Sequence, residues 1–184
     1  AVLGANDGIV SISSLLVGVA SADPSPRAVL IAGVAGLTAG AMSMAAGEYV
    51  SVSSQSDIER ADIARERQAL ADEPEKEHAE LVAIYQHRGL SAKTAKLVAD
   101  ELTGHDALGS HVRDELGLSE MNAANPLQAA LASGATFSVA GGVPLVAAAL
   151  SPASYIIPVV LTVTILALAG LGVFGAKTGG APVG

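Results

Sequence analysis

Residues 28–72 read AVLIAGVAGLTAGAMSMAAGEYVSVSSQSDIERADIARERQALAD, an apolar segment followed without interruption by a charged one. Its first part, from about Ala28 to Val50, carries a single charged residue and exceeds the roughly 20 mostly apolar residues that a helix needs to cross a bilayer. Its second part, from Ser51 to about Asp72, is highly charged and contains neither Gly nor Pro. Because nothing in it would end a helix, we predict one helix that spans the membrane and continues into water.

Three further segments are predicted to span the membrane, and each is bounded by turn residues or by Pro at a helix start. They run from about Ala1 to Ala22, from Pro126 to about Leu150, and from about Tyr155 to Ala176. The chain opens inside an apolar run with no basic region before it, which suggests that the natural N-terminus precedes Ala1. The prediction is an all-α, polytopic membrane protein with four spans and a small helical domain outside the membrane.

Charge is concentrated in the middle of the chain. Fifteen of the 18 acidic residues and eight of the 10 basic residues lie between Ser51 and Asn125, which gives that segment most of the net charge of −8. We therefore expect spans one and two in residues 1–50, an acidic helical domain in 51–125, and spans three and four in 126–184. The acidic balance argues against nucleic acid as a partner, and the lack of cysteine excludes disulfides and thiolate metal sites.

The distribution of basic residues predicts the orientation, since Lys and Arg near span ends favour the cytoplasmic side. Eight of them follow the second span and Lys177 falls on the same side, whereas Arg27 stands alone on the other. This places the acidic domain in the cytoplasm. Within it, Glu73-Pro74 begins a new helix, Ser91 caps another, and a break near Gly104 separates a last helix that ends before Gly117.

Acidic residues recur at helical spacing in this domain, in three groups: Glu59, Asp62 and Glu66; Glu73, Glu77 and Glu80; and His111, Asp114 and Glu115. Like charges on one helix face repel each other unless a cation compensates them. Carboxylates with an occasional imidazole suit Fe(II), Mn(II), Mg(II) or Ca(II). A solvated acidic surface explains the same pattern, and spacing alone does not decide between the two.

Two ionisable residues lie in apolar surroundings, where a charge is costly and a functional role is the default hypothesis. Asp7 lies near the cytoplasmic end of the first span, and Glu48 near the same end of the second. Met44 is one turn before Glu48, so the three side chains are candidates for the lining of a metal path. The alternatives are a helix cap for Asp7 and an interfacial side chain for Glu48.

Four motifs resemble the vacuolar iron transporter family along essentially the whole chain. They are NDGIVS at 6–11, AMSMAAGEYVS at 41–51, PLQAA at 126–130 and GGVPL at 141–145. The resemblance implies a homodimer with five spans per protomer that exchanges cytoplasmic Fe(II), and often Mn(II), for protons. The fifth span would begin where this chain stops. An Ala- and Gly-rich chain suggests a bacterial plasma membrane as its location.

By motif position, the resemblance implies roles for individual residues. Asp7 and Met44 match the family's pore carboxylate and thioether. In the cytoplasmic domain, the matching metal ligands are Glu66, Glu77, Glu80 and Glu115, with His111 as a further candidate ligand one turn before Glu115. Two positions depart from the family: Ala69 stands where relatives often have another glutamate, and Gly36 where plant members carry an acid.

The leading hypothesis is therefore a transporter, not an enzyme, that moves Fe(II) and possibly Mn(II) out of the cytoplasm in exchange for protons, with the ion as cargo and no prosthetic group. One rival is a membrane-anchored carboxylate iron oxidase or storage protein, although di-iron bundles carry a Glu-x-x-His motif on each of two helices, and this sequence does not contain two such motifs. The other is a membrane scaffold with an acidic docking domain.

Overall fold

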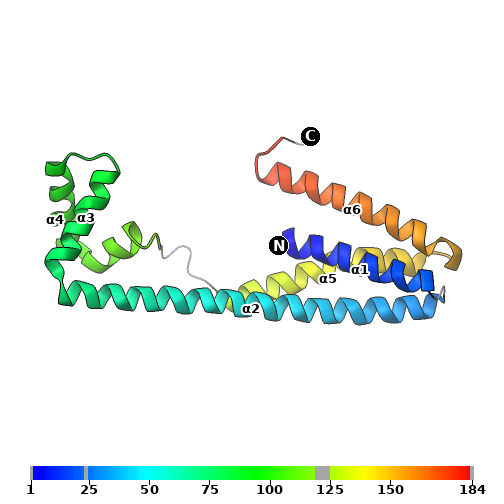
Figure 1. The fold of residues 1–184 in the computed structure, drawn as a ribbon. Helices are drawn as coiled ribbons and strands as arrows, with labels where there is room; N and C mark the ends of the chain where they lie inside the picture. The colour runs from blue at the N-terminus through cyan, green and yellow to red at the C-terminus, as the bar shows by residue number, and fades with distance from the viewer. Residues whose placement is uncertain (1, 23–24, 119–124, 183–184) are drawn as a thin grey trace. The chain divides into compact units, whose positions relative to one another are not determined.

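The computed structural model describes residues 2–22, 25–118 and 125–182, and these residues form helices and no strand (Figure 1). The all-α prediction is confirmed. The elements are α1 (Val2–Ala22), α2 (Pro26–Asp72), α3 (Pro74–His87), α4 (Ala92–Asp114), α5 (Pro126–Leu150), the short 3₁₀ helix η2 (Ala153–Tyr155) and α6 (Ile156–Thr178). The long helix predicted from residues 28–72 is one continuous helix of 47 residues.

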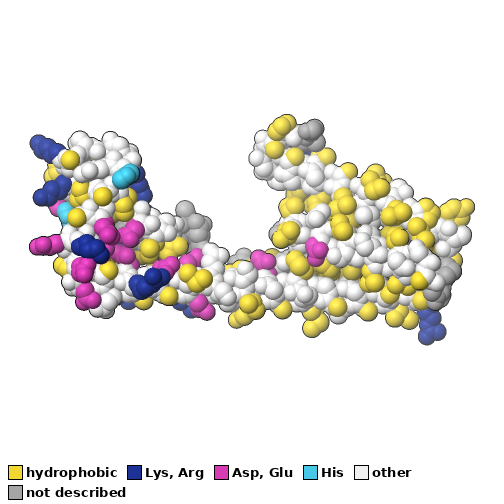
Figure 2. Space-filling model, in the orientation of Figure 1, with side chains coloured by type: hydrophobic (Ala, Val, Ile, Leu, Met, Phe, Trp, Pro, Cys, Tyr) yellow, Lys and Arg dark blue, Asp and Glu magenta, His cyan; other side chains and the backbone are white. Residues whose placement is uncertain are grey.

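The chain divides into two compact units. A membrane unit comprises Ala1–Ser51 and Pro126–Gly184, and an acidic unit comprises Val52–Asn125. Helix α2 contributes its first half to the membrane unit and its second half to the acidic unit. The acidic side chains visible in Figure 2 gather mainly on the acidic unit, over α3, α4 and the end of α2.

Four helices are long and apolar enough to cross a membrane: α1, the first part of α2, α5, and the segment Ala153–Thr178 that contains α6. Many of their large apolar side chains face outward, among them Ile31, Val139 and Leu166, which are 60%, 75% and 66% exposed. A water-soluble protein would bury such residues, whereas a lipid-facing surface accommodates them. The chain is thus an integral membrane protein with four candidate spans among the residues that the structure describes.

The core of the membrane unit forms where α1 packs against α5 and α6. Ile12, Leu16, Phe137, Ile156 and Val160 are buried there. Helix α2 joins this core through a stripe of glycines that leaves space for side chains of its neighbours. A Cβ added to Gly33, Gly36 or Gly40 would lie within 2.5 Å of Leu145, Leu15 or Phe137, respectively. These glycines therefore allow α2 to pack closely against its neighbours.

The acidic unit is held together by α3 and α4, which bury Leu81, Tyr85, Ala95 and Ala99 between them. Ser91 caps α4, as predicted, by accepting a hydrogen bond from the Thr94 N–H at 3.2 Å. The predicted break near Gly104 is found at Asp106, whose backbone is not helical. The Asp106 carboxylate accepts from the Gly109 N–H and so caps the segment that carries His111.

Candidate metal centre and membrane cavity

Four side chains of the acidic unit converge on one point. Glu66 comes from α2, Glu77 from α3 and His111 from α4, and Glu115 follows directly as the C-terminal cap of α4. Each offers one ligand atom, and these atoms all lie within 4.8 Å of one another. Three carboxylates and one imidazole thus come together from three separate helices.

This acid cluster, as we call Glu66, Glu77, His111 and Glu115, is largely removed from water. His111 is 0% exposed, Glu77 3% and Glu66 7%, whereas Glu115 is exposed. The only base that contacts Glu77 within the described part of the chain is Lys76, whose Nζ is 3.9 Å away. Buried carboxylates are stable only when they are paired or bind a cation. The buried carboxylate of Glu66 shares the His111 imidazole with the exposed Glu115.

The hydrogen bonds within the acid cluster leave buried polar atoms without a partner. His111 Nδ1 donates to Glu115 Oε2 at 2.8 Å and lies 2.9 Å from Glu66 Oε1. One N–H serves only one of the two oxygens well. Glu66 Oε1 is therefore left without a hydrogen-bond partner, and His111 Nε2 also has none among the described residues, although both atoms are buried. Orphaned buried ligand atoms of this kind fit a site that is completed by a cation.

The electrostatics of the acid cluster also favour a bound cation. Burial raises the pKa of Glu66 above its usual value, and the neighbouring charges of Glu115, Glu77 and Glu80 raise it further, although His111 acts in the opposite direction. Both effects disfavour the ionised carboxylate in the metal-free protein. A bound divalent cation would reverse this, because its charge stabilises the ionised form.

Of the five residues predicted for this site, the structure brings together Glu66, Glu77, Glu115 and His111. It does not bring Glu80 into the acid cluster: that residue is exposed on α3 and acts on Glu66 only through its charge. Glu77 and Glu80 lie only about 60° apart around the axis of α3, but of the two only Glu77 is buried, so the boundary between interior and solvent falls between them. The remaining histidines take no part, and His78 pairs with Asp100 at 2.7 Å instead.

A second set of contacts holds the end of α4 against α3, next to the acid cluster. Asp114 accepts from the Tyr85 hydroxyl at 2.7 Å and from Arg88 Nη1 at 2.6 Å, and Arg88 Nη2 also donates to the Asp114 carbonyl. Burial alone would raise the pKa of Asp114, but the hydrogen bonds from Tyr85 and Arg88 outweigh it and leave that pKa below its usual value. These contacts fix the last turn of α4, which carries both His111 and Glu115.

The lowered pKa gives a prediction for Asp114→Asn. A carboxyl whose pKa is lower in the folded state stabilises the protein above its unfolded pKa, and the effect is lost as the pH falls through the folded pKa. At pH 7 the variant should lose about 1–3 kcal/mol of stability in the acidic unit. The difference from the wild type should shrink as the pH drops below about 4. Thermal unfolding between pH 3 and 7 measures this, with the exposed Asp57→Asn as the control; a constant difference would contradict the assignment.

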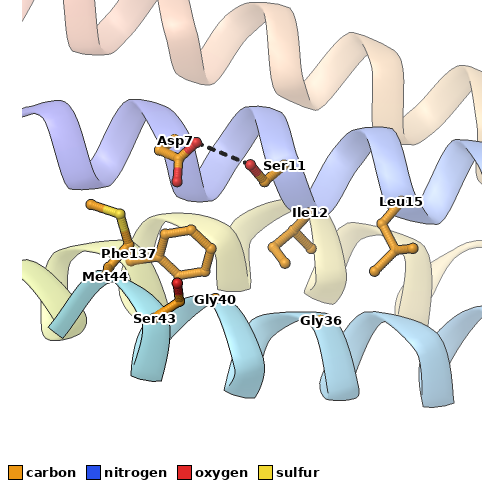
Figure 3. A pocket seen from close by; sticks show the side chains of 9 residues that line it. All are labelled: Asp7, Ser11, Ile12, Leu15, Gly36, Gly40, Ser43, Met44 and Phe137. Carbon is orange, nitrogen blue, oxygen red and sulfur yellow. Dashed lines mark hydrogen bonds between the residues drawn. The ribbon is translucent and has the colours of Figure 1, made fainter. Parts of the chain in front are cut away.

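The membrane unit contains a cavity of about 190 Å³ between α1 and α2. Asp7 and Met44 both line it, together with Ser11 and Ser43, and Ile12, Leu15, Gly36, Gly40 and Phe137 supply the rest of its wall. Figure 3 shows Asp7 and Ser11 one turn apart on α1, facing the Met44 and Ser43 side chains of α2, with the Phe137 ring beside them. Among these lining residues Asp7 is the only one with a charge. The cavity thus joins a hard oxygen ligand and a soft sulfur ligand.

The other membrane candidates lie elsewhere. Glu48 is half-buried on α2 and does not line the cavity. Met42 is 69% exposed, whereas Met44 is half-buried against the core, so only the second methionine faces the cavity. Sequence reasoning missed Ser11, Ser43 and Phe137. The one-turn spacing between Asp7 and Ser11 could have identified Ser11 as a neighbour of Asp7. No local pattern links Phe137 on α5 to the motif that contains Asp7.

These features define a polytopic membrane protein that carries an acidic helical domain with a buried carboxylate–imidazole cluster. The chain belongs to the VIT family, whose model matches residues 1–184. It is 45% identical over 181 residues to a vacuolar iron transporter of Acanthamoeba castellanii, with 98% of this chain and 66% of the relative aligned.

Two plant proteins show the same relationship. Vacuolar iron transporter homolog 1 of Oryza sativa subsp. japonica is 38% identical over 184 residues, which cover all of this chain and 61% of the relative. VIT-like transporter 1a of Glycine max is 34% identical over 183 residues, with 99% of this chain and 71% of the relative aligned. The chain therefore spans about two thirds of the length of these proteins, all of which carry the name of a transporter and none that of an enzyme.

Proposed function

We propose that this protein transports Fe(II), and also Mn(II), out of the cytoplasm in exchange for protons. The observation that carries the proposal is the acid cluster. Its three carboxylates and one imidazole have ligand atoms within 4.8 Å of one another, and its buried atoms Glu66 Oε1 and His111 Nε2 have no hydrogen-bond partner among the described residues. The names of the relatives support iron as the cargo. Carboxylate with imidazole is also a ligand set suited to Mn(II).

In the proposed mechanism, the acid cluster collects the ion on the cytoplasmic side, and the membrane cavity passes it through the bilayer. Asp7 supplies the negative charge that an ion needs in apolar surroundings, and the Met44 thioether favours Fe(II) over the harder Mg(II) and Ca(II). Helix α2 contributes Met44 to the cavity and Glu66 to the acid cluster. Neither Glu80 nor Glu48 is needed as a ligand in this mechanism.

Protons enter because a carboxylate binds metal only when it is deprotonated. A proton that reaches Asp7 from the opposite side of the membrane would therefore release the ion. A pore shared between two protomers would double the number of ligands around the ion, and we propose a homodimer for this reason. We also propose that residues 51–125 lie in the cytoplasm of the cell, on the basis of the distribution of Lys and Arg.

Metal uptake into proteoliposomes tests the proposal. The full-length protein is reconstituted, and entry of Fe(II) or Mn(II) is followed with a dye inside the vesicles, with and without an imposed pH gradient. We expect uptake that accelerates when the vesicle interior is acidic, together with alkalinisation of the interior. Metal entry that ignores the gradient would overturn proton exchange, and the absence of entry for both ions would overturn metal transport.

A further inference from the structure

Ser11 makes a hydrogen bond of a different kind from those of eight other hydroxyl groups in the membrane unit. Ser and Thr within helices usually donate to a backbone carbonyl one turn earlier. The hydroxyls with this bond are those of Ser13, Ser21, Thr38, Thr136, Ser138, Ser151, Thr162 and Thr178. Ser11 instead donates to a side chain, the carboxylate Oδ1 of Asp7, at 3.1 Å.

The consequence concerns the orientation of Asp7. An aspartate on a helix has several side-chain rotamers, and within a membrane its charge would favour those that reach water. The hydroxyl of Ser11 holds one oxygen of Asp7, and the other oxygen is turned toward the side on which Met44 lies (Figure 3). A hydrogen bond to a charged acceptor is stronger than one between neutral groups, so it restrains Asp7 in the orientation that faces the cavity.

We propose that Ser11 is a positioning residue for ion transfer, which holds the Asp7 carboxylate in the membrane cavity so that it meets the ion together with Met44. This inference rests on the proposed function, because it assigns Ser11 a part in the same transport step. Ser11 acts through Asp7. Its loss should therefore change the ion concentration at which transport is half-maximal more than it changes the maximal rate.

The test measures initial rates of Mn(II) uptake by the full-length protein in proteoliposomes over a range of Mn(II) concentrations. For Ser11→Ala we expect the concentration for half-maximal rate to rise roughly tenfold, as is typical for the loss of a hydrogen bond to a charged group, with a maximal rate within about twofold of the wild type. Ser11→Thr retains the hydroxyl and should restore the wild-type concentration to within about twofold.

Two control variants separate positioning from general effects. Ser21→Ala removes an exposed hydroxyl of α1 that bonds only to the Val17 carbonyl, and it should match the wild type. Ser43→Ala removes a hydroxyl that lines the same cavity but makes no hydrogen bond to Asp7 in the described structure, and it should change the half-maximal concentration less than Ser11→Ala does. Equal effects of the two cavity variants would show that cavity polarity matters instead of positioning.

A double substitution tests whether Ser11 acts through Asp7. In an Asp7→Glu background the longer side chain no longer meets the hydroxyl in the same way, so Ser11→Ala should add less than about a twofold change. Any of three results would overturn the inference. Ser11→Ala could have the same half-maximal concentration as the wild type, or Ser11→Thr could fail to restore that concentration. The third result is that the effects of Ser11→Ala and Asp7→Glu are additive. If the wild type itself moves no metal, the proposed function fails and the inference fails with it; a transporting wild type with an unaffected Ser11→Ala rejects the inference alone.

Discussion

Asp7→Asn is expected to reduce metal uptake by proteoliposomes at least about 100-fold, because it removes the only charge from the lining of the membrane cavity. Asn has nearly the same size as Asp and still accepts a hydrogen bond from Ser11, so the packing of α1 should not change. A divalent cation, however, would find only neutral ligands in a cavity bounded by Ile12, Leu15 and Phe137. The loss should therefore appear in transport and not in folding.

Methionine provides a matched pair for the same experiment. Met44→Ala removes the thioether from the cavity, and we expect a loss of roughly tenfold that is greater for Fe(II) than for Mn(II), since sulfur favours the softer ion. Met42→Ala makes the same chemical change two residues away, on a side chain that is 69% exposed and does not line the cavity. It should leave uptake unchanged. Similar effects of the two substitutions, or normal uptake by Asp7→Asn, would contradict the role of this cavity in transport.

Glu66→Gln is expected to have opposite effects on metal binding and on stability. It removes one of three carboxylate ligands from the acid cluster, so the affinity for Mn(II) should fall at least about 100-fold, beyond the effect typical of outer-shell changes. It also removes a buried charge that its surroundings disfavour, so the metal-free protein should become more stable by about 1 kcal/mol at pH 7. Mn(II) titration and thermal unfolding in a chelator measure the two effects.

The pH dependence of the stability effect has a defined sign. The pKa of Glu66 is raised in the folded state, by burial first and by the neighbouring carboxylates second. A raised pKa gives stability that is complete below the unfolded pKa and is lost as the pH rises through the folded pKa. The advantage of Glu66→Gln over the wild type should thus be present at neutral pH and disappear below about pH 4. For the same reason, metal binding by the wild type should weaken as the pH falls toward the range in which Glu66 titrates.

Two exposed glutamates of α3 serve as controls for Glu66→Gln. Glu75→Gln and Glu80→Gln each remove one negative charge without changing the acid cluster. Both should bind Mn(II) within a few-fold of the wild type, because exposed charges are screened by solvent and salt. A loss for Glu80→Gln as large as that for Glu66→Gln would mean that Glu80 is a ligand after all. Unchanged binding by Glu66→Gln would contradict the assignment of the acid cluster as a metal site.

The sequence predicted the helices well because their signals are local. The absence of Gly and Pro between Ser51 and Asp72 was enough to predict one continuous helix, and Ser91 and Pro126 marked helix starts that the structure contains. The break in α4 was predicted two residues too early, at Gly104 and not at Asp106. There the cap is formed by a side chain that bonds to a backbone N–H three residues later, and Gly is a weaker indicator of such a break than an Asp cap.

The candidate sites show the limits of sequence reasoning. Helical spacing grouped Glu77 with Glu80, but it did not tell which of them faces inward, since that depends on where α3 lies against α4. It also gave no reason to place Glu66 beside His111, which is 45 residues away in the sequence. Family resemblance named both residues as candidates, and the packing of three helices brings their side chains to within 2.9 Å of each other.

The helix over residues 28–72, with its apolar first half and acidic second half, could be predicted without a structure, because hydrophobicity, charge and the absence of helix breakers are properties of neighbouring residues. The packing of the helices settled which carboxylates of the acidic unit are buried with His111, and which side chains accompany Asp7 and Met44 in the membrane cavity. These are contacts between residues that are far apart in the sequence. They depend on how each helix is rotated against its neighbours, which the local sequence pattern does not fix.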